Sequence, residues 1–246
     1  MYDIVIPLKE ARPNIDLRFT LRSIAKFGCA FGRVWIVGFK PSWIQNVEYI
    51  STVQTSDKWS NTRRNLEEIC LNPELSENFL LFNDDFILSK KIESWDWFSD
   101  MYLGTLSEHA EEFSKVKKKS PWQAGFEYNQ TILRKLGCST LFDYEYHGPL
   151  LMNKNSLAEL FERIKPFYDS KDGILFKRSL YGNLYGKKPA RKIDDIKFVS
   201  DCHDFKKVYV NRCFSVGDNV IGNLRKAPKL QVWFNSYLNE KSVFEK

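Results

Sequence analysis

Residues 3–38 read DIVIPLKEARPNIDLRFTLRSIAKFGCAFGRVWIVG and set the fold class. The apolar run that opens the stretch is typical of a buried first strand. Asn14 or Asp16 can begin a helix whose apolar residues recur at helical spacing, and Gly28 can end it. RVWIVG, residues 33–38, indicates a second strand. A strand, a helix and a strand within about forty residues are typical of a crossover in a parallel sheet.

Length and composition predict one α/β domain. The chain has 246 residues, of which 43% are hydrophobic and 28% charged, which is ordinary for a globular domain. No run approaches the roughly 20 apolar residues of a membrane-spanning helix, and the first residues do not read as a signal peptide. The five cysteines show no metal-ligand spacing. We therefore expect a cytoplasmic protein with reduced thiols.

The most informative local feature is FLLFNDDFIL, residues 79–88. It predicts a central strand that is interrupted by Asn83 and by an acidic pair, Asp84 and Asp85. Neighbouring carboxylates at the end of a buried strand repel each other unless a cation balances them. Such oxygen ligands suit Mg²⁺ or Mn²⁺, which can neutralise a nucleotide diphosphate. The alternative is a pair of turn residues that cap the next segment.

His147, in YEYHGPLLMN, is one of three histidines and a candidate general base. Asp143 or Glu145 could raise its basicity and fix its tautomer, as proton abstraction from an acceptor hydroxyl requires. A structural histidine in a turn is an equal alternative. His109 and His203 have no supporting context in the sequence.

A helix that Ser60 is expected to cap contains Arg63 and Arg64. An arginine beside a helix N-terminus can hold a diphosphate, because guanidinium donors and backbone amides favour the same anion. The two arginines point to different faces, so we expect at most one to serve the site. Pairing with Glu67 or Glu68 is the alternative for the other.

The second half of the chain shows a mixed pattern. Residues 91–120 are expected to be largely helical, residues 155–164 to form a helix, residues 208–216 (VYVNRCFSV) to form a strand, and LQVWFNSYL to form a helix.

The net charge of +6 favours polyanionic partners, although a solvated basic surface is an equal alternative. Much of the excess lies in residues 171–192, where Phe176, Tyr181 and Tyr185 interleave with lysine and arginine. Basic side chains combined with aromatic rings suit the phosphates and the stacked nucleobases of a nucleic acid. The chain has no GxxxxGK[ST], GxGxxG or GxSxG motif, so kinase-like, dinucleotide-binding and serine-hydrolase functions lose their usual support.

Several blocks in a fixed order carry a family resemblance. They are DIVIPLKE (3–10), IDLRFTLRSIAKF with RVWIVGFKPSWIQN (15–46), NTRRNLEEICLNPELSENFLLFNDDFIL (61–88), HGPLLMNKNSL (147–157), and CFSVGDN with WFNSYLNEKSVFEK (213–246). Together they resemble the Stealth family of sugar-phosphate transferases, which includes bacterial capsule polymerases and the catalytic precursor of the lysosomal-enzyme N-acetylglucosamine phosphotransferase. The Trp-Val-Asp of the family's first block is absent here.

The resemblance implies a Rossmann-like mixed sheet of the metal-dependent nucleotide-sugar transferase type (GT-A-like). We expect a single domain spanning residues 1–246, with a donor-binding half at about 1–90 and an acceptor and catalytic half at about 91–246. It also implies that Asp218 lies near the acidic pair and Arg178 near the donor phosphates. The implied site comprises catalytic His147, Asp85 and Asp218, metal-binding Asp84 and Asp85, and substrate-binding Glu10, Asn61, Arg63, Arg178 and Asn219.

The leading hypothesis is a transferase that moves a glycosyl unit from a nucleotide sugar to a hydroxyl of a polymer, with Mg²⁺ or Mn²⁺. Two acceptors stay open: DNA with hydroxymethylated bases, as some phages make, which would place the protein in the host cytoplasm, and an acidic surface glycan. Transfer of a sugar 1-phosphate to a capsule or surface glycan is an alternative reaction. A non-catalytic module that binds a nucleotide or glycan is the alternative from another class.

Overall fold

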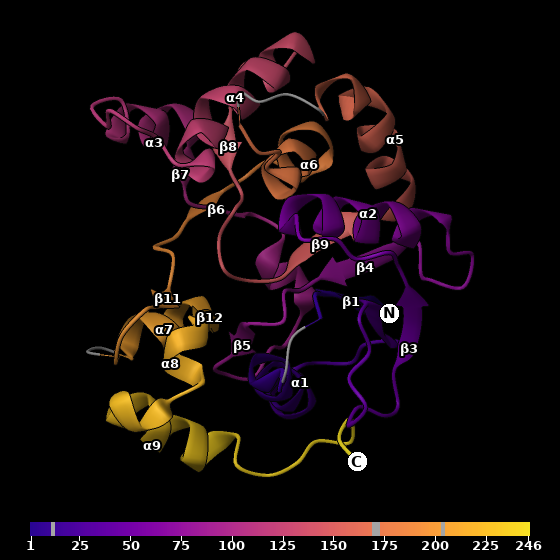
Figure 1. The fold of residues 1–246 in the computed structure, drawn as a ribbon, viewed down its shortest axis with the longest axis vertical. Helices are drawn as coiled ribbons and strands as arrows, with labels where there is room; N and C mark the ends of the chain where they lie inside the picture. The colour runs from indigo at the N-terminus through magenta and orange to yellow at the C-terminus, as the bar shows by residue number, and fades with distance from the viewer. Residues whose placement is uncertain (11–12, 169–172, 203–204) are drawn as a thin grey trace. The chain divides into compact units, whose positions relative to one another are not determined.

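The computed structural model describes residues 1–10, 13–168, 173–202 and 205–246, and the chain forms two compact units (Figure 1). The first unit contains Met1–Phe98, His147–Leu151 and Asp194–Lys246, and the second contains Ser99–Tyr146 and Met152–Ile193. Each unit therefore combines segments that are distant in sequence. His203 and the first two residues of the basic stretch, 171 and 172, lie outside the described residues.

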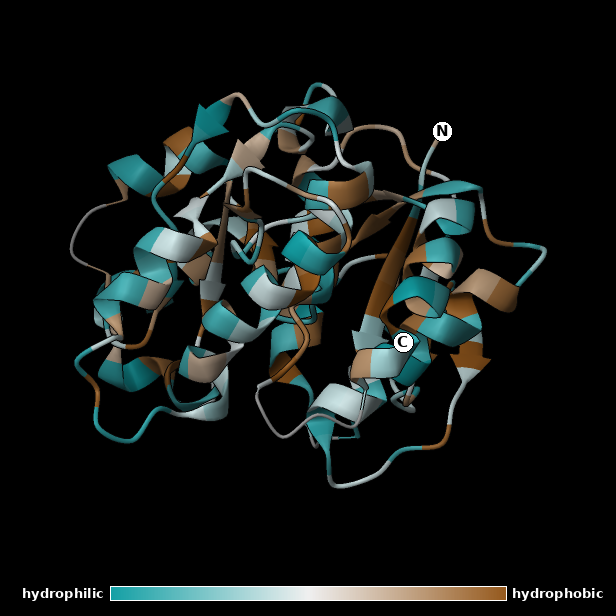
Figure 2. Cartoon of the chain, turned by 90° about the horizontal axis from the view of Figure 1, so that it is seen from above, coloured by the Kyte–Doolittle hydropathy of each residue, from teal (hydrophilic) through white to brown (hydrophobic). Residues whose placement is uncertain are grey.

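The first unit is built on a five-stranded sheet with the order β3-β2-β1-β4-β9. The strands are β1 (Asp3–Leu8), β2 (Val34–Gly38), β3 (Glu48–Ser51), β4 (Asn78–Leu81) and β9 (Leu150–Asn153). β1 runs parallel to β2 and β4, and β2 runs parallel to β3. The central strands are hydrophobic (brown in Figure 2) and almost entirely buried. This order is that of a Rossmann-like sheet, so the predicted α/β class is confirmed.

Helices α1 (Ile15–Phe27) and α2 (Lys58–Leu71) connect strands of this sheet. α1 buries its apolar positions, and Asn14 precedes it in a left-handed conformation without a side-chain cap. α2 is capped by Asp57, whose carboxylate accepts hydrogen bonds from the backbone amides of Trp59 and Ser60. The prediction that Ser60 caps this helix is therefore wrong, because the helix begins two residues earlier.

The run at residues 79–88 forms two strands in two sheets rather than one central strand. β4 lies in the main sheet, whereas β5 (Phe86–Leu88) pairs antiparallel with β12 (Cys213–Val216). β12 pairs in parallel with β11 (Lys197–Phe198). The single-strand prediction is wrong because the acidic pair forms a turn that directs the chain from one sheet into the other.

Helices pack against this second sheet of the first unit. They are α7 (Lys206–Asn211), α8 (Asp218–Ile221), η3 (Leu224–Lys226) and α9 (Pro228–Tyr237). A short helix, η1 (Trp95–Phe98), follows β5 in the chain. The strand predicted at residues 208–216 is wrong in its first half, where Val208 is buried on α7 and Arg212 ends that helix with a positive φ of 61°. The helix predicted at LQVWFNSYL is confirmed as α9.

The second unit consists of helices with short strand pairs. Its elements are β6 (Met101–Tyr102), β7 (Gly104–Thr105), α3 (Leu106–Glu112), α4 (Pro121–Lys135), β8 (Phe142–Asp143), α5 (Lys154–Ile164), η2 (Lys165–Phe167), α6 (Lys177–Tyr185) and β10 (Arg191–Lys192). The helix predicted at residues 155–164 is confirmed. Residues 91–120 are less helical than predicted, because strands and turns separate η1 from α3.

Two of the three aromatic rings of the basic stretch are buried, whereas Tyr185 is half-buried. Phe176 and Tyr181 are only 1% and 3% exposed, and Phe176 packs against Trp122 and Phe126. The expectation that these two rings stack on bases is therefore wrong, because they form part of the hydrophobic core of the second unit. None of the helices in the described parts of the chain is long and apolar enough to cross a membrane.

Candidate functional site

The acidic pair is held in place by the buried face of α1. The Thr20 hydroxyl donates a hydrogen bond of 2.6 Å to the Asp84 carbonyl oxygen, and Thr20 is completely buried. The Ser23 hydroxyl accepts a hydrogen bond from the amide of Leu88, on β5. Two small polar side chains of one helix therefore fix both the turn and the strand that follows it (α1 beside β5 in Figure 1).

Four carboxylates interact electrostatically around this turn. Asp16 lies in the first turn of α1 and Asp218 in the first turn of α8. Burial, followed by repulsion from Asp85 and Asp16, raises the pKa of Asp84 to about 8. Burial, followed by repulsion from Asp218 and Asp85, raises the pKa of Asp16 to about 7. Burial and mutual repulsion therefore both disfavour the ionised forms of Asp84 and Asp16.

These residues fit a divalent cation in chemistry and charge. All four offer hard oxygen ligands of the kind that Mg²⁺ and Mn²⁺ prefer. The buried Oδ1 atom of Asp16 has no hydrogen-bond partner. Among the described residues, however, no three or more His, Cys, Asp and Glu side chains are arranged to hold a metal ion by themselves. A cation here would need oxygen atoms from a ligand to complete its coordination, which is how Mg²⁺ is commonly held beside substrate phosphates.

His147 is oriented by a carboxylate, but not by the one that the sequence indicated. Its Nδ1 atom lies 2.5 Å from Asp195 Oδ2, and its backbone amide donates to Asp195 Oδ1 at 2.8 Å. Although burial raises the pKa of Asp195, the hydrogen bonds from His147 outweigh it, so the pKa is lowered. The expectation that Asp143 or Glu145 orients His147 is wrong, because both carboxylates have partners within the second unit. Asp143 accepts a hydrogen bond from the amide of Glu145, and Glu145 accepts one from the amide of Ser179.

Lys197 links the histidine to the acidic pair. Its Nζ atom lies 3.4 Å from His147 Nε2 and 3.5 Å from Asp85 Oδ2. The register of the second sheet explains this placement, because Lys197 is paired with Ser215 and Ser215 with Phe86. The Ser215 hydroxyl donates to Asp85 Oδ2 at 2.6 Å, and the ring of Phe86 stands edge-on to that of His147.

The structure places the remaining predicted residues as follows. Glu10 and Asn219 are exposed, and Asn219 follows Asp218 directly on α8. Asn61 is buried and exchanges hydrogen bonds with the backbone and hydroxyl of Thr55. Arg63 lies 3.9 Å from Glu67 on the next turn of α2. Asn61 and Arg63 thus have local structural partners, and their predicted contacts with substrate stay predictions.

Arg178 belongs to the second unit, where it is buried. Its Nε atom donates to the carbonyl oxygen of Tyr144 at 3.0 Å, and its guanidinium lies over the ring of Tyr146. His109, which had no supporting context in the sequence, has its Nε2 atom 3.4 Å from Asp143 Oδ2. The role of Arg178 toward donor phosphates stays a prediction.

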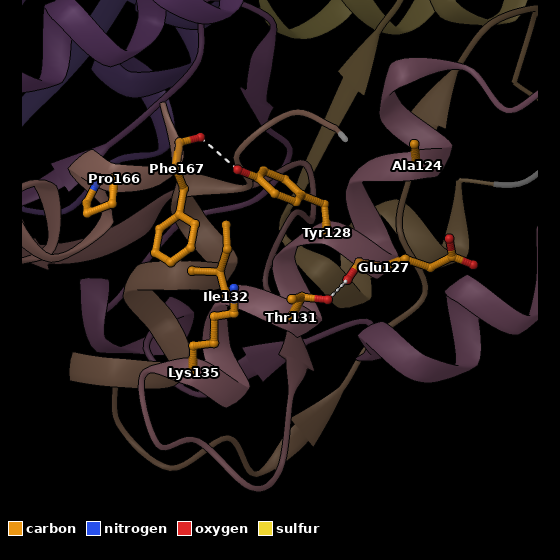
Figure 3. A pocket seen from close by; sticks show the side chains of 8 residues that line it. All are labelled: Ala124, Glu127, Tyr128, Thr131, Ile132, Lys135, Pro166 and Phe167. Carbon is orange, nitrogen blue, oxygen red and sulfur yellow. Dashed lines mark hydrogen bonds between the residues drawn. The ribbon is translucent and has the colours of Figure 1, made fainter. Parts of the chain in front are cut away.

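A pocket of about 600 Å³ lies in the second unit between α4 and η2 (Figure 3). In the wall of the pocket, the Tyr128 hydroxyl donates a hydrogen bond of 2.7 Å to the carbonyl oxygen of Phe167, and the ammonium of Lys135 lies over the ring of Phe167. None of the predicted site residues lines this pocket.

Sequence reasoning missed Asp195, Lys197 and Ser215 as site residues and considered Asp16 only as a helix cap. A usable signal was present, because Asp195 and Lys197 alternate with apolar residues in IDDIKF. Residues two apart in an extended segment lie on the same face. Ser215 gave no signal on its own, because its role depends on the pairing of β12 with β5.

No protein-family model matches this chain. Its sequence is 24% identical over 236 residues to the exopolysaccharide phosphotransferase CpsY of Mycobacterium leprae, a match that covers 86% of this chain. The chain spans about two fifths of that relative, because the match covers 41% of its length.

Among solved structures, the galactosyltransferase LgtC in complex with donor and acceptor sugar analogues matches with a TM-score of 0.48 and 12% identity, over 80% of this chain and 75% of LgtC. An active-site mutant of LgtC matches with a TM-score of 0.47 and 12% identity, over 85% and 82%. The sequence similarity to the mycobacterial exopolysaccharide phosphotransferase confirms the predicted resemblance to the Stealth family of sugar-phosphate transferases.

Proposed function

We propose that this protein transfers a sugar 1-phosphate from a nucleotide sugar to a hydroxyl group of a glycan. The observation that supports it most directly is the short path from a carboxylate-oriented histidine to the acidic pair. The similarity to an exopolysaccharide phosphotransferase supports both the reaction and the class of acceptor. The leading hypothesis from the sequence was glycosyl transfer. We now favour the alternative reaction, transfer of a sugar 1-phosphate.

The contact that the base and the acidic pair share favours attack at phosphorus. Nε2 of His147 and Oδ2 of Asp85 both contact the same ammonium group, at 3.4 Å and 3.5 Å. A hydroxyl that is hydrogen-bonded to Nε2 would therefore be near a phosphoryl group held at the acidic pair. In glycosyl transfer the hydroxyl attacks the anomeric carbon instead. That carbon and its sugar ring would then also have to fit between Nε2 of His147 and the acidic pair.

Asp84 and Asp85, with Asp16 and Asp218 beside them, would hold a divalent cation together with oxygen atoms of the diphosphate. Such a cation neutralises charge that develops on the phosphoryl oxygens and on the leaving group. Its presence would also offset the repulsion that raises the pKa of Asp84 and Asp16 after the contribution of burial.

His147 then acts as the general base. Its Nδ1–H donates to Asp195, which fixes the tautomer and leaves the lone pair on Nε2. Nε2 takes the proton of the acceptor hydroxyl while the hydroxyl oxygen bonds to the sugar-bearing phosphorus. The bond from that phosphorus to the bridging oxygen breaks, and a nucleoside monophosphate leaves with the electron pair.

We favour a glycan over DNA as the acceptor. The burial of Phe176 and Tyr181 removes two of the rings on which the DNA hypothesis relied. The predicted contacts of Arg178 with donor phosphates, and of Glu10 and Asn219 with substrate, belong to this proposal as well.

The released nucleotide provides the test. The protein is incubated with Mn²⁺, a panel of nucleotide sugars and an oligosaccharide acceptor, and the products are separated by anion-exchange chromatography. Release of a nucleoside monophosphate that depends on the acceptor is expected. Release of a nucleoside diphosphate would show glycosyl transfer instead, and release of neither from any donor would refute a transferase.

Variants test the assignment of the base. His147→Ala is expected to reduce turnover by at least about 100-fold, the usual contribution of general acid–base catalysis. Asp195→Asn is expected to reduce turnover less and to leave thermal stability close to that of the wild type. His109→Ala is the matched control, because His109 contacts Asp143 in the second unit. Unchanged turnover of His147→Ala would exclude His147 as the base.

A further inference from the structure

Lys197 occupies the place where the proposed chemistry has to happen. Its ammonium contacts Nε2, the atom of His147 that must accept a proton, and Oδ2 of Asp85, an atom that would face the cation. Nδ1 of His147 is engaged with Asp195, so Nε2 accepts a hydrogen from the ammonium. In this arrangement the ammonium lies beside the atom that would accept the proton, and its charge partly balances that of Asp85.

Both contacts of the ammonium are loose. Strong charge-assisted hydrogen bonds between nitrogen and oxygen measure about 2.7–2.9 Å, whereas the Lys197 ammonium lies 3.5 Å from Asp85 Oδ2. Its contact with the nitrogen of His147, at 3.4 Å, is also long for a hydrogen bond. The Lys197 side chain is 40% exposed, and ion pairs at such sites contribute about 1 kcal/mol or less. A lysine held so weakly can change partners when a stronger cation or anion arrives.

A divalent cation at the acidic pair would make the present position of Lys197 unfavourable. It would compete with the ammonium for Asp85, and the two positive charges would repel each other at close range. A diphosphate bound with the cation would offer phosphate oxygens as new partners for the ammonium.

We propose that Lys197 is a positioning residue that binds phosphate. Its ammonium group leaves Asp85 and His147 and contacts a phosphate oxygen of the donor when the donor binds. The inference rests on the proposed function. In the donor-free protein Lys197 covers Nε2 of His147, and binding of the cation with the diphosphate uncovers it. Proton abstraction is thereby coupled to donor binding, so the base becomes available only when a phosphoryl group is present.

Two binding measurements on Lys197→Gln test the exchange without any assay of turnover. The first follows binding of Mn²⁺ alone by its electron paramagnetic resonance signal. We expect the variant to bind Mn²⁺ about tenfold more tightly, because a competing positive charge has been removed. The second follows binding of inorganic pyrophosphate in the presence of saturating Mn²⁺ by calorimetry. Here we expect the variant to bind about tenfold more weakly, because a phosphate partner has been lost.

Tighter binding of Mn²⁺ together with weaker binding of pyrophosphate distinguishes this role from a structural one. Lys197→Arg keeps the charge and is expected to restore most of the pyrophosphate affinity. Lys207→Gln is the matched control, because Lys207 forms an exposed ion pair with Asp194 near the same strand, and both of its affinities should equal those of the wild type. Thermal unfolding of each variant verifies that the fold is intact.

Every other pattern overturns the inference. Weaker binding of both probes to Lys197→Gln would mean that the lysine only maintains the site, and unchanged binding of both would mean that it takes no part. If those results come with release of a nucleoside monophosphate by the wild type, the proposed function survives without the exchange. A wild-type protein that binds neither Mn²⁺ nor pyrophosphate and transfers nothing would overturn both proposals.

Discussion

Replacing Glu245 by glutamine tests how the helix that supports the acidic pair is fixed. The Glu245 carboxylate accepts hydrogen bonds from Arg22 Nε at 2.7 Å, Arg22 Nη2 at 2.9 Å and Arg18 Nη1 at 2.8 Å. The amide of Ser242 adds a hydrogen bond of 3.0 Å, and the carboxylate side chain is fully buried. Arg18 and Arg22 lie on α1, so this carboxylate attaches residues 242–246 to the helix that carries Asp16 and Thr20.

The pKa of Glu245 sets the magnitude. Burial by itself raises it, but hydrogen bonds from Arg22, Ser242 and Arg18 outweigh burial and lower it from 4.5 to about 2. A shift of that size corresponds to about 3 kcal/mol in the free energy of unfolding at neutral pH. Removing one partner of a buried ion pair costs about 3–5 kcal/mol. We therefore expect Glu245→Gln to destabilise the protein by about 3 kcal/mol at pH 7.

The pH dependence provides the stricter test. Because the pKa is lower in the folded protein than in the unfolded chain, the stabilisation is complete above about pH 4.5 and is lost as the pH falls toward 2. Urea unfolding of wild type and variant at pH 7, 5 and 3.5 measures the difference. It should be constant from pH 7 to 5 and smaller at pH 3.5. Glu240→Gln, an exposed glutamate of the same segment, is the control. Equal stability of wild type and Glu245→Gln at pH 7 would refute the reasoning.

Two further predictions concern the acidic pair. In metal-free solution Asp84→Asn should be more stable than the wild type at pH 8, with the gap closing toward pH 4. Burial, followed by repulsion from Asp85 and Asp16, raises the pKa of Asp84 from 3.8 to about 8. Wild-type stability therefore falls as the pH rises from about 4 to about 8. Melting temperatures across this range would show a constant gap if the assignment were wrong. Thr20→Val should lower the free energy of unfolding by about 1–3 kcal/mol, because the Asp84 carbonyl oxygen loses its hydrogen bond from Thr20. Urea unfolding measures that loss, and a stability equal to that of the wild type would contradict it.

The parts of the fold that follow local periodicity were predictable. The run at residues 3–38 alternates a strand, a helix and a strand with clear apolar faces, and the structure forms β1, α1 and β2 there. Residues 79–88 show the limit of such reasoning. Both halves are apolar enough to form a strand, and only the pairing of β5 with β12, more than a hundred residues away, separates them into two sheets.

The site was predictable where chemistry is concentrated in adjacent residues. Asp84 and Asp85 are conspicuous because two charges interrupt an apolar run, and His147 because histidines are few in this chain. Asp195 and Lys197 stand out less: their alternation with apolar residues places them on one face, but it does not show what that face meets. Their meaning comes from the β11-β12-β5 register, which brings Lys197 beside Ser215 and Ser215 beside Phe86. Register between distant strands is a tertiary property that a single sequence does not display.

The electrostatics of this site oppose the stability of the folded protein. Asp16 and Asp84 would each be more favourable as neutral side chains, because burial and neighbouring carboxylates raise the pKa of both. In a protein selected only for stability, amides or apolar side chains would take the positions of Asp16 and Asp84. The chain instead anchors α1 on both sides, through Glu245 on one and through Thr20 and Ser23 on the other. Rigid support around these acidic side chains holds their oxygens in place, so the cation and the diphosphate of the proposed reaction would bind without the cost of first ordering the turn at Asp84 and Asp85.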